Sequence, residues 1–238
     1  MRDQMTVLPT TLMYHSVADE ASDPYRITVS PARFAAQMRW LHRLGLQGVS
    51  VRELLEAARH GSTRRLVGLT FDDGYADFST EVLPVLDRYG FTATAYIVSD
   101  KIGGHNDWDA DGPVKPLMSR DQVREAADRG IEIGSHGSRH RSLAAANPDV
   151  LASEVDRSRD ILGSLLGTAV GGFCYPYGDL SDEALAATQD AGYDYAVATS
   201  HLARRDRHAL PRIYVGERDG FARLCAKEIR YRLMWRGR

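Results

Sequence analysis

Short apolar runs alternate with amphipathic stretches along the whole chain, and this alternation constrains the fold more than any other feature. The apolar runs predict strands at 11–15, 66–71, 91–98, 131–133, 170–175, 195–199 and 212–215. The stretches between them predict helices at 30–44, 50–61, 78–90, 119–130, 148–166, 181–191 and 221–235. Strands that alternate with helices predict a mostly parallel α/β sheet with both faces covered. Seven or so such units favour an incomplete or distorted barrel, and an open doubly wound sheet is the alternative.

The bulk composition is that of a globular domain. Hydrophobic residues make up 43% of the chain and charged residues 26%, which excludes a disordered or fibrous protein. The 238 residues fit a single domain over 1–238, and no repeat or linker divides them. The formal charge of −2 provides no positive field, so we expect no nucleic-acid partner.

The segments that bear on location are the two ends of the chain. Residues 1–9 lack the apolar core of a secretory signal, and no apolar run is long enough to span a bilayer. Cys174 and Cys225 match no zinc or redox spacing, which favours reduced thiols. We therefore expect a cytoplasmic protein. Basic and apolar residues mix in the tail at 227–238, and we favour a packing helix over peripheral contact with an anionic membrane.

Polar residues directly follow several of the predicted strands. They are His15, the pair Asp72 and Asp73, and the segments 136–140 and 175–178. In parallel α/β folds the carboxyl ends of the strands host the active site. Side chains alternate along a strand, so one aspartate can bind a cation while the other stays free as a base. An isolated Asp-Asp-Gly is also a common turn, which is the plain alternative.

Two histidines four residues apart, His136 and His140, can share one metal ion. Two exposed loop histidines would look the same in isolation. With Asp73 the set becomes Asp-His-His, and three protein ligands leave an open position for water, as in catalytic sites. We expect Zn²⁺, with Co²⁺, Ni²⁺ or Fe²⁺ as alternatives, because the order of affinities does not fix which metal is bound in a cell.

Three motifs carry a family resemblance: TFDDG at 70–74, HGSRH at 136–140 and YPYG at 175–178, with GIEIGSH at 130–136 leading into the second. Their order and spacing resemble the first three motifs of the NodB-homology polysaccharide deacetylases, carbohydrate esterase family four. The similarity covers roughly 10–215. It implies a distorted (β/α) barrel of about seven parallel strands, and a metal-dependent enzyme that removes acetyl groups from sugars.

The resemblance also implies a role for each motif residue. Asp73, His136 and His140 would hold the metal ion, which polarises a carbonyl and activates water. Asp72 would be the general base for that water. The backbone N–H of Tyr177 would be a donor to the oxyanion.

Two departures from the family pattern concern the neighbours of the base. Cys174 stands where the family carries an arginine, and no Leu-x-His motif occurs near the C-terminus. The strand that ends in Tyr14-His15 resembles the permuted poly-N-acetylglucosamine deacetylases, which implies that His15 is the general acid. A buried histidine bonded to backbone is the alternative. Arg212 would replace the missing arginine and keep Asp72 ionised, with a surface ion pair as the alternative.

A glycine- and aspartate-rich segment at 101–117 predicts a functional surface loop. Its residues His105, Asn106, Trp108 and Asp109 would wall a sugar site, and a tryptophan packed on the barrel rim is the alternative. We therefore expect a sugar N-deacetylase whose substrate is an N-acetylhexosamine-containing carbohydrate, as a free sugar, an oligomer or a carrier-linked unit. The alternatives are a hydrolase of a small non-sugar amide or cyclic imide, and a non-catalytic carbohydrate-binding protein of the same fold.

Overall fold

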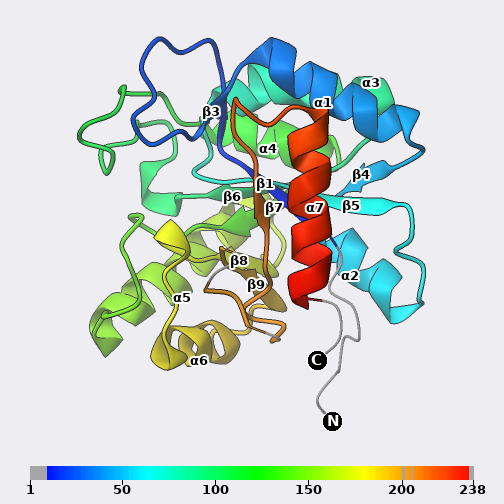
Figure 1. Cartoon of the computed structure of the whole chain (residues 1–238). Coiled ribbons are helices and arrows are strands. Elements are labelled where there is room, and N and C mark those ends of the chain that lie inside the picture. Colours follow the sequence, from blue (N-terminus) through cyan, green and yellow to red (C-terminus); the bar gives the residue numbers. More distant parts are fainter. Residues whose placement is uncertain (1–9, 200–201, 205, 236–238) are drawn as a thin grey trace.

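The centre of the molecule is a curled sheet in which every pairing is parallel (Figure 1). The computed structural model describes residues 10–199, 202–204 and 206–235. In sheet order the strands are β10 (Ile213–Tyr214), β1 (Thr11–Tyr14), β5 (Leu66–Phe71), β6 (Thr94–Ile97), β7 (Glu132–Ser135), β8 (Gly172–Cys174) and β9 (Tyr195–Val197). Apart from β10 the order follows the chain without reversal. The distorted (β/α) barrel is thus confirmed, and the doubly wound alternative, which needs a reversal, is wrong.

The two edges of this sheet are joined by one segment of chain. Leu210 forms a parallel bridge to Val197 of β9, and three residues later β10 pairs with β1 through Ile213 and Leu12. The segment therefore touches β9 with its first residue and β1 with its last. Arg212 lies inside it, so the fold fixes this side chain between the two edges.

The strands separate two apolar layers. Alternate residues, such as Leu69, Phe71 and Ile97, belong to the large core between the sheet and the helices. The residues between them, such as Tyr96 and Tyr195, fill the barrel interior as a second cluster. Because both faces of each strand are covered, the strands have near-continuous apolar sequences, which is why they were recognisable as uninterrupted runs.

The helices form the outer layer around the sheet (Figure 1). Serine or asparagine side chains cap five of them at the N-terminus, which fixes where each begins. Gly90 and Gly167, both in the left-handed conformation, end two of them. The α-helices are α1 (Pro31–Arg43), α2 (Val51–Arg59), α3 (Leu83–Tyr89), α4 (Arg120–Asp128), α5 (Pro148–Leu166), α6 (Asp182–Asp190) and α7 (Phe221–Trp235). Shorter turns of helix are η1 (Phe78–Val82), η2 (Ser99–Lys101) and η3 (Pro176–Gly178).

Three short strands are present that the sequence pattern did not predict. β4 (Gln47–Val49) pairs with the first half of β5, on the side where β6 pairs with the second half. A Cβ at Gly48 would lie 2.5 Å from Leu69, so a glycine is needed there, and it interrupts the apolar run that would reveal a strand. β2 (Ser16–Val17) and β3 (Thr28–Val29) form a separate two-residue ribbon, too short to show a period.

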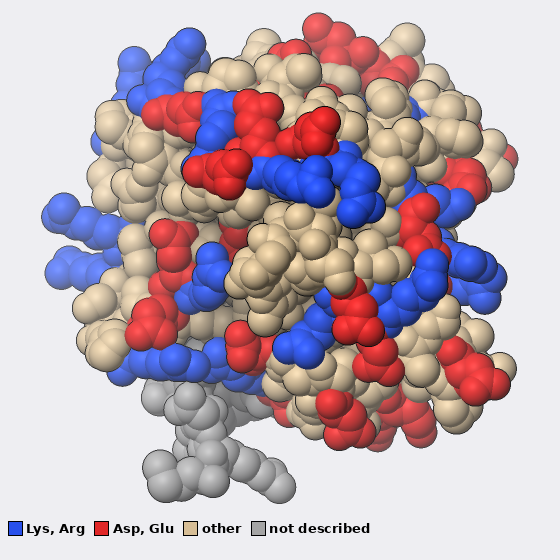
Figure 2. Space-filling model, turned by 180° about the vertical axis from the view of Figure 1, so that it is seen from behind, with Lys and Arg blue, Asp and Glu red and all other residues tan. Residues whose placement is uncertain are grey.

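The surface carries both charge signs in close mixture. Figure 2 shows, on the face opposite to that of Figure 1, basic and acidic side chains interleaved around an uncharged centre. In the part of the chain that the structure describes, no helix has both the length and the apolar character needed to cross a membrane. The prediction made for residues 1–9 concerns a segment outside the described residues.

Candidate active site

A cavity of about 300 Å³ opens at the carboxyl ends of the strands. The structure brings the predicted site residues together in its lining: His15, Asp72, Asp73, Trp108, Asp109, His136, His140, Tyr177 and Arg212. These residues come from segments spread over nearly two hundred positions of the chain. They meet because parallel strands deliver their carboxyl ends to the same end of the barrel.

Asp73 faces two imidazole rings. Its Oδ1 lies 3.3 Å from Nε2 of His136 and 3.2 Å from Nε2 of His140, and all three side chains are buried. Among the described residues, no hydrogen-bond donor satisfies this carboxylate oxygen. A buried oxygen without a donor, with two ring nitrogens directed at it, is the environment that a bound divalent cation would satisfy. The residues present therefore fit a metal ion.

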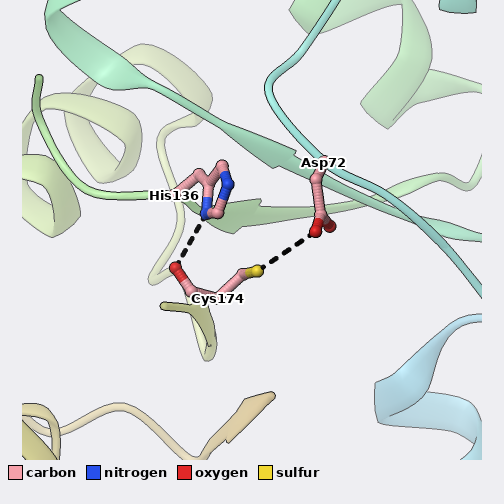
Figure 3. Close-up of side chains that lie close together, drawn as sticks. All are labelled: Asp72, His136 and Cys174. Carbon is pink, nitrogen blue, oxygen red and sulfur yellow. Dashed lines mark hydrogen bonds between the residues drawn. The ribbon is translucent and has the colours of Figure 1, made fainter. Parts of the chain in front are cut away.

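The orientation of the His136 ring is fixed by a backbone carbonyl. Its Nδ1 lies 2.8 Å from the carbonyl oxygen of Cys174 (Figure 3). Because a carbonyl can only accept, Nδ1 carries the proton and Nε2 directs a lone pair towards Asp73. A second histidine nitrogen bonded in this way is the usual support of a metal ligand.

The protonation of the two histidines differs. Burial lowers the pKa of His140, which favours its neutral, ligand-competent form. Burial also opposes the charged form of His136, but the polar groups of Cys174 and the carboxylates Asp73 and Asp72 raise its pKa well above the usual range. Burial would raise the pKa of Asp73, yet the two histidines lower it well below the usual range. A cation and a proton would thus compete for Nε2 of His136.

Three of these residues hold an unusual backbone conformation. Asp73 has φ of 71°, His140 of 59° and Tyr177 of 60°, all in the left-handed region. Within the described residues, Arg26 is the only other residue besides glycine with positive φ. This conformation is costly for residues with a Cβ, and it gathers at functional sites where the surrounding structure enforces it.

Asp72 is paired with Arg212. Nη1 and Nη2 of Arg212 donate to the two carboxylate oxygens at 2.6 Å and 2.8 Å, and Nη1 also donates to Thr70 at 3.0 Å. The arginine side chain is 1% exposed, so the surface ion pair is wrong. Burial would raise the pKa of Asp72, but Arg212 outweighs it and lowers the pKa below its usual value. The carboxylate is therefore ionised and held in one orientation.

Cys174 has a steric explanation. Its Sγ lies 3.0 Å from Nη2 of Arg212 and 3.5 Å from Oδ2 of Asp72, beneath the base (Figure 3). A long side chain at position 174 would occupy the space that Arg212 takes from the other direction. The trio Asp72, His136 and Cys174 is close enough to suggest a second metal site. However, the Asp72 carboxylate already accepts from Arg212, and the His136 Nδ1 donates to the carbonyl of Cys174. These groups are therefore not available to a second metal ion, and they instead hold Asp72 and His136 in place beside Asp73.

His15 follows β1 and reaches the cavity from the side of Asp72. Its Nε2 lies 3.9 Å from Oδ2 of Asp72, and its side chain is 17% exposed. Within the described residues its Nδ1 has no hydrogen-bond partner. The ring is therefore not a core histidine bonded to backbone, and it is free to face a substrate.

Tyr177 lines the cavity, and its backbone N–H and its ring have different surroundings. No acceptor for its backbone N–H lies within hydrogen-bond distance in the described parts of the chain, whereas the N–H of Gly178 donates to Tyr175. The Tyr177 ring packs edge-on against His140, with centroids 4.6 Å apart, and is half exposed at the mouth of the cavity. The η3 turn thus leaves one N–H unpaired beside the buried ligands.

The long loop at 101–117 supplies part of the cavity wall, but with two of its four predicted residues. Trp108 stacks on His140 with centroids 4.5 Å apart, and Asp109 lines the cavity beside it. Asn106 is buried in bonds within the loop, and His105 is exposed away from the lining. The loop therefore contributes Trp108 and Asp109 to the cavity wall, while His105 and Asn106 are not part of the lining.

Sequence reasoning missed several lining residues, namely Met13, Tyr25, Ile27 and Thr199. Tyr25 and Ile27 lie between β2 and β3 and close the side of the cavity near His15. The Tyr25 hydroxyl accepts from the backbone N–H of Asp111, so this segment meets the long loop across the mouth. The available signal was an exposed aromatic in a polar loop directly after a strand that carries a site histidine.

Comparison with known proteins identifies the family. The family model described as polysaccharide deacetylase matches residues 59–196, more than half of the chain. The Bacillus subtilis (strain 168) protein YxkH, which carries a polysaccharide deacetylase name, is 32% identical over 209 residues, covering 86% of this chain and 70% of that protein. The chain belongs to the polysaccharide deacetylase family. The expected enzyme class, a hydrolase of amide bonds, is thereby confirmed.

Relatives with named substrates are more distant. The poly-β-1,6-N-acetyl-D-glucosamine N-deacetylase of Escherichia coli (strain K12) is 29% identical over 86% of this chain, and this chain spans only 36% of it. The Streptococcus pyogenes deacetylase PplD, solved with acetate, superposes with a TM-score of 0.78 at 24% identity, over 93% of this chain and 98% of that one. IcaB from Ammonifex degensii superposes with a TM-score of 0.74 at 21% identity, over 93% and 97%. These two likenesses support the fold.

Proposed function

We propose that this polysaccharide deacetylase removes N-acetyl groups from an N-acetylhexosamine-containing carbohydrate and depends on a divalent metal ion. The observation that carries the proposal is the adjacent pair of carboxylates with opposite surroundings. Asp73 faces two histidines and its Oδ1 has no donor among the residues that the structure describes, while Asp72 is neutralised by Arg212. One position is suited to a cation and the next to a base.

The metal would be held by Asp73, His136 and His140, and we propose Zn²⁺ first, with Co²⁺, Ni²⁺ and Fe²⁺ as alternatives. When bound, such an ion polarises a carbonyl and lowers the pKa of water. Two imidazoles and one carboxylate leave room for substrate and water at the open side of the site. All three side chains of this set are buried.

The chain's own residues account for the proton transfers. Asp72 takes a proton from the attacking water as the new C–O bond forms at the acetyl carbon. The N–H of Tyr177 donates to the oxygen that gains negative charge. His15 gives a proton to the departing nitrogen as the C–N bond breaks, which yields acetate and a free amine on the sugar. Arg212 keeps Asp72 ionised before the first step.

The cavity favours a single sugar ring. A volume of about 300 Å³ is at the small end of ligand pockets. Trp108, Tyr25 and Tyr177 give it aromatic surfaces against which a pyranose ring can pack, and Asp109 can accept from a hydroxyl. The names of the Escherichia coli and Staphylococcus aureus relatives support N-acetylglucosamine units as the first substrates to test.

The deciding experiment is acetate release from N-acetylglucosamine oligomers and from simple N-acetyl sugars. The purified protein is assayed with added Zn²⁺ or Co²⁺, with a chelator, and as the variant Asp73→Ala. We expect release that needs metal and is lost in the variant. Metal bound without release from any sugar would favour a small amide or cyclic imide. Neither metal nor release would favour a binding protein of the same fold.

The charges on α7 bear on the membrane hypothesis. Arg223 and Lys227 pair with Asp219, and Arg232 pairs with Glu228. Because these cations are already neutralised within the protein, we keep the interpretation of α7 as a packing helix. The cytoplasmic location and the extent of the domain over 1–238 stay predictions.

A further inference from the structure

The loop that carries both histidine ligands is tied to α5 by one buried carboxylate. Glu154, 1% exposed, accepts from the backbone N–H of Ser138 at 3.0 Å and of Arg139 at 2.9 Å through the same oxygen, Oε2. Its other oxygen accepts from the Ser138 hydroxyl at 3.1 Å. Three consecutive donors between the two ligands thus end on a single side chain, which itself does not line the cavity.

The same loop is held from the opposite side by η2. The backbone N–H of Ser99 donates to the carbonyl of Gly137 at 3.1 Å, and that of Asp100 donates to the carbonyl of Ser138 at 2.9 Å. The N–H groups of Ser138 and Arg139 therefore point to α5, and the carbonyls of Gly137 and Ser138 point to η2. Such a two-sided attachment leaves the peptide planes little freedom to rotate.

The Glu154 carboxylate packs closely against the backbone of Gly137. Gly137 has φ of 77°, and a Cβ built on it would lie 2.7 Å from Oε2 of Glu154. Any other residue would collide with Glu154 and also strain the backbone. The glycine between the ligands is thus explained by the carboxylate beneath it.

The geometry assigns Glu154 as a positioning residue of the metal centre, an inference that rests on the proposed function. His140 keeps a left-handed backbone, which relaxes unless neighbouring groups enforce it. Glu154 binds the backbone N–H groups of Ser138 and Arg139, the two residues before His140, so it fixes the course of the backbone from which the His140 ring leaves the loop. It acts on the metal through His140 and touches neither substrate nor metal.

The design of the test follows from the hydrogen bonds. In Glu154→Gln, the amide oxygen can accept both N–H groups while the amide nitrogen donates to the Ser138 hydroxyl, so the loop should keep its conformation without the charge. Glu154→Ala removes both acceptor oxygens and with them all three hydrogen bonds. Leu162→Ala, two turns further along α5 in the apolar core, is the matched control that destabilises the same helix without touching the loop.

The measurement is the dissociation constant for Zn²⁺, by competition with a chelator, together with the visible absorption of the Co²⁺ form, which reports ligand geometry. Asp73→Ala establishes that the ion measured is the one at this site. We expect Glu154→Ala to weaken Zn²⁺ binding about 10- to 100-fold and to change the Co²⁺ spectrum. Glu154→Gln should stay close to the wild type, and Leu162→Ala should lose stability but keep wild-type affinity.

Wild-type affinity and spectrum in a folded Glu154→Ala protein would overturn the inference and leave the proposed function standing. If Glu154→Ala does not fold, Glu154→Asp replaces it, because the shortened carboxylate cannot reach both N–H groups; unchanged affinity there would overturn the inference equally. A wild type that binds neither ion would instead contradict the proposed function, and this inference with it.

Discussion

The two ends of the barrel use the same backbone conformation in different ways. At the amino ends of the strands, the left-handed positions that end α3 and α5 are glycines, Gly90 and Gly167, with open space around them. At the carboxyl ends, Asp73, His140 and Tyr177 hold that conformation with full side chains. Glycine adopts it without strain, whereas the other residues do not. Of the four non-glycine residues with this conformation in the described chain, three therefore line the cavity at the carboxyl ends, and the fourth is Arg26.

Buried charge shows the same contrast. At the amino ends, the carboxyl of Glu132 accepts from the backbone N–H of Arg52 and from the hydroxyl of Thr94. At the carboxyl ends, Asp72 is balanced by a full cation, while Asp73 Oδ1 has no donor within the described residues. Oε1 of Glu132 also has no partner within the described residues, so the two ends differ in the cation that balances Asp72 and in the two imidazoles that face Asp73. The predictions below test this division.

The largest effects are expected for the two neighbouring aspartates. Asp73→Ala should abolish both metal binding and acetate release, because it removes the only carboxylate among the three ligands. Asp72→Asn should keep the metal and lower the rate by about 10²- to 10⁴-fold, the contribution of a general base. Metal analysis and initial rates measured side by side check both. Equal loss of metal in the two variants would contradict separate roles.

Arg212→Ala should reduce stability as well as rate. It leaves the buried Asp72 carboxylate without its cation, and breaking a buried pair costs about 3–5 kcal/mol. Urea unfolding measures the stability, and assays of the folded fraction measure the rate. An unchanged rate in folded protein would remove Arg212 from the catalytic set.

Placing a glycine at a left-handed position of the carboxyl end and an alanine at one of the amino end should change stability by smaller amounts and in opposite directions. Tyr177→Gly should relieve strain of about 1–2 kcal/mol, partly offset by the entropy of the unfolded chain, and should retain activity within a few-fold because the N–H remains. Gly167→Ala at the amino end should cost about 1 kcal/mol and leave activity unchanged. Thermal unfolding and acetate release measured for both check the pair. A large rate loss in Tyr177→Gly would indicate that the tyrosine ring, and not the backbone N–H, is what the reaction needs.

The smallest effect concerns Glu132 and pH. Burial raises its pKa above the value of an exposed glutamate, although Arg52 and Thr94 oppose the rise. The stability that it contributes is therefore complete below its unfolded pKa and is lost as pH rises through the folded pKa. Glu132→Gln cannot ionise, so the wild type should lose stability relative to the variant as the pH rises above 4.5, the ordinary glutamate value. Denaturant unfolding at several pH values checks this, and parallel curves would contradict it.

The sequence was most informative where a property is local. Buried strands appear as continuous apolar runs, caps and glycines mark the helix ends, and the three motifs locate the carboxyl-end residues without coordinates. β4 escaped notice because its central glycine is set by the packing of Leu69, a contact 21 positions away that leaves no local pattern. The role of Glu154 escaped for the same reason, since a lone glutamate in a helix is ordinarily a solvated residue.

Arg212 shows the limit most clearly. Its sequence context was equally compatible with a surface ion pair, and only the closure of the barrel brings it to Asp72. The structure also explains the cysteine at position 174, because a small side chain there leaves room for Arg212. A contact between residues so far apart in the sequence cannot be predicted from the segment around Arg212 or from the segment around Cys174 alone.

The segment that joins β9 to β1 has a consequence for biosynthesis. Asp72 leaves the ribosome 140 residues before Arg212, the cation that neutralises it. Until that last strand is inserted, the growing chain would have to bury a carboxylate without compensation, which is strongly unfavourable. Closure of the barrel therefore also supplies the cation that balances Asp72. We expect a nascent or truncated chain that lacks this last segment to be unstable, because its Asp72 would be either exposed to water or buried without compensation.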